Sequence, residues 1–225
     1  MFFKDRRTLF GVITCTYCCF LFQFASSFFV TALEYEKHVP IQYNGAIASY
    51  GSLTYLLTTV LTGYIIHIMP KRLFILLSFV SITIGLFLMG PSDILGLPNY
   101  IWLFLVGYGL VGAAQGFLFI PILPEIIEAF SDRYGIKEGE NEEVDESVSD
   151  LASGLYGAFY YTGMIISPIT GSLIYHHYKS FNKTCDLFAM FSIGYIIIFY
   201  IFNILPDRKT LWQHNLPKSE EKKLE

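Results

Sequence analysis

Residues 101–122 read IWLFLVGYGLVGAAQGFLFIPI and contain no Asp, Glu, Lys or Arg. A helix needs about 20 predominantly apolar residues to cross the roughly 30 Å hydrocarbon core of a bilayer, because each residue adds about 1.5 Å of length. Helices buried inside soluble proteins are seldom this long and this free of charge. The stretch therefore predicts a membrane-spanning helix.

Outward from this stretch, the sequence has five further runs without a charged residue, at 9–30, 45–66, 73–92, 151–175 and 187–205. The whole chain is 53% hydrophobic, with a mean hydropathy of +0.48. In lipid a segment must satisfy its own backbone hydrogen bonds, which favours helices, and the runs lack the alternation of barrel strands. We therefore predict an all-α, polytopic membrane domain over 9–205 with six transmembrane helices.

The N-terminal segment also has a feature of signal peptides, because Lys4, Arg6 and Arg7 precede an apolar run. The run 9–30 is longer than the usual apolar region of a signal peptide, which is about 7–15 residues. We expect a retained first helix that follows a short tail at 1–8.

Several functional classes are disfavoured by the residues. Cys15-x-x-Cys18 has the spacing of a zinc or redox pair, but no second pair accompanies it, so we expect packing cysteines and no metal site. The net charge of −4 offers no basic face for nucleic acid. We find no HExxH, P-loop or credible Ser/His/Asp set, and therefore expect neither an enzyme nor a cofactor.

The distribution of basic residues predicts an orientation. Six spans place both termini on one side, together with the connecting segments 67–72 and 123–150 and the tail 206–225. That side has all of the 15 Lys and Arg except Lys37, Lys179 and Lys183. The positive-inside rule then places both termini in the cytoplasm. Asn182, in Asn182-Lys183-Thr184, is a candidate glycosylation site on the opposite side.

One connecting segment, 123–150, is long and acidic. We expect a solvated, mobile cytoplasmic loop, with a docking segment for a basic partner as the alternative. Its acidic residues are Glu125, Glu128, Asp132, Glu138, Glu140, Glu142, Glu143, Asp145, Glu146 and Asp150.

Small residues and prolines mark the fourth and fifth predicted spans. Gly112-x-x-x-Gly116 has the spacing that lets two membrane helices approach closely, and we expect Gly163 and Gly171 to pack in the same way. Pro168 interrupts the hydrogen-bond ladder of its helix and is a candidate hinge. The first and last three spans have similar layouts, which is typical of half of an inverted-repeat transporter.

Four local patterns, taken in order along about 10–205, resemble the major facilitator superfamily, and specifically the C-terminal six-helix half of its vesicular amine and polyamine transporter group. They are the loop signature from Gly63 through His67 to Lys71-Arg72, the Leu88-Met89-Gly90-Pro91 run, the Gly116, Pro121 and Pro124-Glu125 element, and the Gly163, Pro168 and Gly171 element.

The resemblance implies two six-helix halves with the solute site between them, lined by the first and fourth helices of each half. Gln23 and Gln115 would then line the cavity, and the alternative is that they form interhelical hydrogen bonds that only hold the bundle together. His67 departs from the family's Asp, and no acid lies inside any span, which argues against amine recognition by this half.

A charged pair is expected near the inner end of the fourth span. Glu125 is placed to pair with Lys71 or Arg72 and to form an inward gate. A solvated loop position without such a pair is the alternative.

These observations predict a secondary transporter, or half of one, for a small organic solute, embedded in a lipid bilayer. Its partner would be a second six-helix half or another copy of the chain, and the chain would be a fragment, a split half or a recruited remnant. The alternative is a non-transporting membrane scaffold or assembly subunit derived from a transporter half. The sequence leaves open whether the membrane is the plasma membrane or that of a vesicle.

Overall fold

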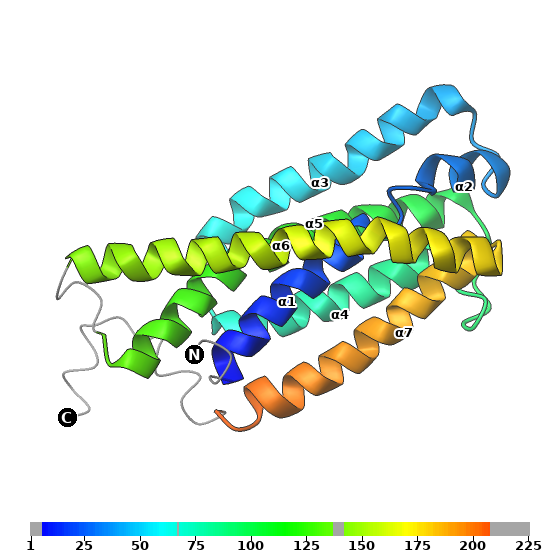
Figure 1. The fold of residues 1–225 in the computed structure, drawn as a ribbon. Coiled ribbons are helices and arrows are strands. Elements are labelled where there is room, and N and C mark those ends of the chain that lie inside the picture. Colours follow the sequence, from blue (N-terminus) through cyan, green and yellow to red (C-terminus); the bar gives the residue numbers. More distant parts are fainter. Residues whose placement is uncertain (1–5, 67, 137–141, 208–225) are drawn as a thin grey trace.

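A computed structural model of the chain describes residues 6–66, 68–136 and 142–207, and these residues form an all-α bundle (Figure 1). The α-helices are α1 (Arg6–Gln23), α2 (Phe29–Tyr35), α3 (Asn44–Ile65), α4 (Lys71–Met89), α5 (Ile101–Tyr134), α6 (Glu142–Tyr178) and α7 (Phe181–Phe199). A 3₁₀ turn, η2 (Ile41–Tyr43), precedes α3, and a π-helical turn, η3 (Tyr200–Ile204), follows α7.

Helix α5 is the centre of the bundle, where it packs against α4, α3 and α1. Helix α6 packs mainly on α1, and α7 packs mainly on α4. Helix α3 lies to one side, against α5, and is set apart from the rest of the bundle (Figure 1). Consequently α3 and α6 flank one side of α1 and α5, while α4 and α7 lie on the other.

Three helical segments in the described part of the chain are long and apolar enough to cross a membrane: Lys71–Met89, Ile101–Tyr134 and Phe181–Ile204. Helix α1 lacks this degree of apolarity because it begins with two arginines and ends with Gln23. Helices α3 and α6 are rich in Gly, Ser, Thr and Tyr. The predicted all-α class is confirmed, whereas the spanning roles of α1, α3 and α6 stay predictions.

The first predicted span, 9–30, is wrong as a single helix. Helix α1 ends at Gln23, and tight turns, in which Ser26 and Phe28 donate to carbonyls three residues earlier, separate it from α2. The aromatic side chains explain the break, because Phe24 packs on Phe188 with ring centroids 4.3 Å apart, and Phe28 stacks on Tyr175 at 4.4 Å. Both phenylalanines are buried in the core.

The acidic segment 123–150, which we expected to be a solvated, mobile loop, is helical over most of its described residues. Helix α5 runs through Pro121 and Pro124 to Tyr134, and α6 begins at Glu142. At about 1.5 Å per residue, the 34 residues of α5 measure roughly 50 Å, which exceeds the hydrocarbon thickness. Gly135 ends α5 with a left-handed φ of 64°, and both Gly135 and Ile136 donate to the carbonyl of Ser131.

Glycines allow these helices to approach one another. On α5, Gly107 faces the backbone of α4, whereas Gly112 and Gly116 face the backbone and threonines of α3. On α6, Gly163 lies against the backbone of Thr16 in α1, and Gly171 lies against the backbone of Phe24 in the turn after α1. A side chain at any of these positions would meet a neighbouring backbone, so the contacts depend on the missing Cβ.

Ser167 and Pro168 extend the contact between α6 and the α1 segment. The Ser167 hydroxyl donates to the carbonyl of Phe20, and the Ser27 hydroxyl donates to the carbonyl of Pro168 at 3.2 Å. The helix continues through Pro168 to Tyr178.

Candidate functional site

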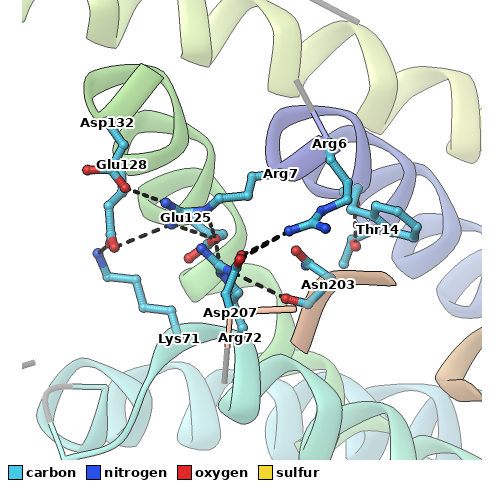
Figure 2. Close-up of polar contacts among 11 residues, drawn as sticks. Arg6, Arg7, Thr14, Lys71, Arg72, Glu125, Glu128, Asp132, Asn203 and Asp207 are labelled. Atoms are coloured by element: carbon cyan, nitrogen blue, oxygen red, sulfur yellow. Dashed lines mark hydrogen bonds and ion pairs between the residues drawn. The ribbon is translucent and has the colours of Figure 1, made fainter. Parts of the chain in front are cut away.

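A buried arginine lies at the centre of a charged cluster at one end of the bundle (Figure 2). Arg72, the second residue of α4, is 5% exposed, and its Nε donates to Oε1 of Glu125 at 2.7 Å. Its Nη1 donates to Oδ2 of Asp207 at 2.6 Å and to the backbone carbonyl of Asn203 at 3.2 Å. One guanidinium therefore joins α4 to α5, to η3 and to the segment that follows η3.

Arg7 of α1 contacts three carboxylates of α5. Its Nη2 lies 3.0 Å from Oε1 of Glu125 and 3.4 Å from Oε1 of Glu128, and its Nη1 pairs with Asp132. Residues spaced by three and four lie on one face of a helix, which explains why α5 presents these carboxylates together. Lys71 pairs with Glu128 at the edge of the cluster.

Among the described residues, the salt bridges of the cluster join equal numbers of basic and acidic side chains. Four basic residues, Arg6, Arg7, Lys71 and Arg72, face four acidic residues, Glu125, Glu128, Asp132 and Asp207. Glu125 is 4% exposed and is contacted by both Arg7 and Arg72, so its desolvated charge has two partners. Removing one partner of such a buried pair is typically far more destabilising than removing an exposed one.

Asp207 shows how strongly these cations act at the end of the described chain. Partial burial alone would raise the pKa of its carboxyl, but the hydrogen bond and charge of Arg72, together with Arg6, hold that pKa below the usual 3.8. Asp207 is therefore ionised at neutral pH, and it links Arg72 to Arg6 of α1. The cluster ties together α1, α4, α5 and the segment after α7.

The sequence left open whether Glu125 pairs with Lys71 or Arg72, and the structure pairs it with Arg72. All members of the cluster belong to this bundle. Of the other residues of the predicted loop signature, Gly63 is exposed with open space beside it, and His67 lies outside the described residues. Sequence reasoning missed the contributions of Arg7 and Asp207, which are distant from Arg72 along the chain.

Of the two glutamines predicted to line a cavity, Gln115 is fully buried between α5 and α1. Its Oε1 accepts a hydrogen bond from the Cys18 thiol at 3.3 Å, and its Nε2 has no partner among the described residues. Gln23 is half-buried and is the last residue of α1. The structure therefore does not bring the two glutamines to equivalent places.

The candidate glycosylation residue, Asn182, is half-buried in the first turn of α7. Its Oδ1 accepts a hydrogen bond from Lys37 Nζ at 2.8 Å, and the same ammonium contacts Asn99. Glu36 accepts from the backbone amide of Phe181 at 2.7 Å. These contacts fasten the end of α2 to the beginning of α7.

A group of aromatic rings, which sequence reasoning also missed, lies where α1, α3, α5 and α6 meet. We call it the aromatic patch; it consists of Phe22, Tyr55, Phe119 and Tyr160. The rings of Phe22, Tyr55 and Phe119 lie 6.0–6.1 Å apart by centroid, and Tyr160 lies 5.7 Å from Phe119. Phe22 is 39% exposed. The spacings Cys18–Phe22 and Gln115–Phe119 could have pointed to the patch, because residues four apart share a helix face.

The chemistry of the aromatic patch is limited by its surroundings, because the predicted spans that contain it have no charged residue. A cation over a ring face gains about 0.5–1 kcal/mol when exposed and about 2 kcal/mol when desolvated, whereas an ammonium that gives up water without a carboxylate partner loses free energy. An uncharged ring has no such cost, and it gains about 0.5–1.5 kcal/mol per aromatic contact beyond the burial of its area. The patch is therefore better suited to an uncharged ring than to an ammonium.

Residues 12–223 match the model of the Major Facilitator Superfamily. The chain is 26% identical to the human protein named MFS-type transporter SLC18B1 over 189 residues, which are 82% of this chain and 40% of that protein. It is 27% identical to the rat protein of the same name over 175 residues, 76% of this chain and 37% of the relative. The chain thus spans less than half the length of these curated relatives.

Proposed function

Because the chain belongs to the Major Facilitator Superfamily, a family of membrane transporters and not of enzymes, we propose that it forms a six-helix half of a secondary transporter for a small organic solute. The first of the six spans consists of α1 together with α2, and the other five are α3, α4, α5, α6 and α7. Both termini lie in the cytoplasm. Of all observations, the family match over residues 12–223 carries this proposal most directly.

The arrangement of the helices supports a solute-facing surface between α3 and α6, which we call the working face. The three least apolar of the long helices, α1, α3 and α6, adjoin this face, whereas α4 and α7 lie behind it. Helices beside a solute path need not be as apolar as helices surrounded by lipid. A second six-helix half, or another copy of the chain, covers this face, and the solute binds between the two bundles.

The charged cluster supports the second part of the proposal, which concerns the gate. Arg72 and Glu125 lie at the bundle end where the described residues begin and end, at Arg6 and Asp207, and the pair closes that end on the cytoplasmic side. Arg7 and Asp207 hold the pair in position from α1 and from the chain after η3. Rocking of the two halves about the midplane then exposes the solute alternately to the two sides.

Flux measurements on proteoliposomes test the proposal. The chain is reconstituted alone and together with the part of the human relative that it does not match, and uptake of radiolabelled spermidine, tryptamine, glucose and uridine is followed. We expect saturable uptake of at least one probe above that of protein-free liposomes in one of the two preparations. Uptake at the protein-free level in both, with folded protein present, would contradict transport and favour the scaffold function.

A further inference from the structure

The aromatic patch is assembled from four helices that are distant in sequence. Phe22 comes from α1, Tyr55 from α3, Phe119 from α5 and Tyr160 from α6. The Tyr55 and Phe119 rings are nearly perpendicular, at 85°, and those of Phe22 and Phe119 at 89°. Edges and faces are therefore both presented at one place, with Phe22 and the half-buried Tyr55 and Tyr160 accessible.

Two buried polar atoms that find no hydrogen-bond partner among the residues the structure describes belong to residues one helical turn from members of the patch. Nε2 of Gln115 is four residues before Phe119, and Oγ1 of Thr59 is four residues after Tyr55. Gln115 precedes Gly116 in the chain, and the backbone nitrogen of Thr59 is among the atoms nearest to Gly116. A buried polar group without a hydrogen bond is costly, so each of these atoms is a candidate partner for a polar group of a ligand.

The absence of charge from the predicted spans of this chain favours an uncharged ligand at the patch. A primary ammonium placed there would lose its water and find ring faces but no carboxylate in the predicted spans. An uncharged ring would keep the stacking contacts without that loss, and its polar edge atoms would reach toward the Gln115 amide and the Thr59 hydroxyl.

We propose that the aromatic patch is a binding site for an uncharged solute that carries an aromatic ring with a hydrogen-bonding substituent. This inference rests on the proposed transporter function, because it names the class of solute that the working face receives. Phe22, Tyr55, Phe119 and Tyr160 contact the ring, and Gln115 and Thr59 supply the polar contacts. The site discriminates against the same ring when it carries an ammonium group.

Two probes that share the same ring system and differ in one substituent test this inference. Tryptophol and tryptamine share an indole and an ethyl arm, which ends in a hydroxyl in the first and in an ammonium in the second. Binding of each is measured by equilibrium dialysis against the full chain in lipid nanodiscs, with empty nanodiscs to subtract partition into lipid. We expect saturable tryptophol binding that is at least about tenfold tighter than tryptamine binding.

Substitutions locate the site. Phe22→Leu and Tyr160→Leu are expected to weaken tryptophol binding at least about fivefold. The matched control is Phe191→Leu, because Phe191 on α7 is 53% exposed and lies outside the patch, and its loss should leave binding unchanged. Size-exclusion chromatography establishes that each variant is folded before its affinity is compared.

The proposal is overturned if the folded chain shows no saturable tryptophol binding, or if tryptamine binds as tightly as tryptophol. It is also overturned if the folded Phe22→Leu and Tyr160→Leu variants bind tryptophol as tightly as the unaltered chain does. These outcomes are separable from failure of the transport proposal. Tryptophol binding without uptake of radiolabelled tryptophol, or of the four other probes, in proteoliposomes would overturn transport alone. Uptake of spermidine or tryptamine without tryptophol binding would overturn this inference alone.

Discussion

Replacing Arg72 by methionine is expected to destabilise the folded chain by about 3–5 kcal/mol, because it leaves the buried Glu125 carboxylate with one cation instead of two. The same change removes the hydrogen bonds from α4 to Asp207 and to the Asn203 carbonyl. Reversible unfolding in mixed micelles, followed by circular dichroism, measures the free energy of unfolding.

Lys71→Met is the matched control for this prediction, since Lys71 is the preceding residue and its ion pair with Glu128 is partly exposed. We expect a loss of about 1 kcal/mol or less for this variant. Adding Glu125→Gln to Arg72→Met should restore part of the stability, because it removes the unbalanced buried charge. Equal losses for Lys71→Met and Arg72→Met, or no recovery in the double variant, would contradict the role assigned to the pair.

Gly107→Ala is expected to lower the free energy of unfolding by about 1–3 kcal/mol or more, although alanine forms helices better than glycine. A Cβ at this position would collide with backbone atoms of Gly85, Leu88 and Met89 in α4, and backbone cannot rotate away as a side chain can. The helices α4 and α5 would have to separate along the most extensive contact of the bundle.

Gly194→Ala serves as the control, because Gly194 lies within α7 and a Cβ there meets no atom within 4 Å. We expect this variant to be unchanged or stabilised by up to about 1 kcal/mol. The two identical substitutions should therefore have opposite signs in the same unfolding assay. A stabilised Gly107→Ala variant would show that α4 and α5 do not pack as closely as described.

Much of the architecture could be predicted from the charge-free runs, since such runs in lipid must be helical. The break between α1 and α2 could not, because it depends on where Phe24 and Phe28 find Phe188 and Tyr175, which are distant in sequence. Likewise, acidic composition favoured a loop after residue 122. The helix continues there because Arg7, Lys71 and Arg72 neutralise the carboxylates on one face of α5.

The sequence predicted a contact in the candidate site only where a residue had few possible partners. Glu125 had two basic candidates, so a pair with Arg72 or Lys71 could be anticipated. The burial of Gln115 against Cys18, and the meeting of Phe22, Tyr55, Phe119 and Tyr160, depend on how four helices rotate about their axes. Composition and periodicity do not determine those rotations when most faces of a helix are apolar.

A six-helix transporter half requires six membrane crossings, including those of α1, α3 and α6. The most direct test of these crossings is the side of the membrane on which each connecting segment lies. The native cysteines described are buried, so single exposed positions can be replaced by cysteine and labelled with an impermeant maleimide in sealed vesicles. Ile68→Cys and Tyr134→Cys should label from the side that carries the termini. Tyr43→Cys, Leu95→Cys and Lys179→Cys should label only from the opposite side. Labelling of Tyr43→Cys and Ile68→Cys from the same side would show that α3 does not cross, and it would contradict the six-helix transporter half.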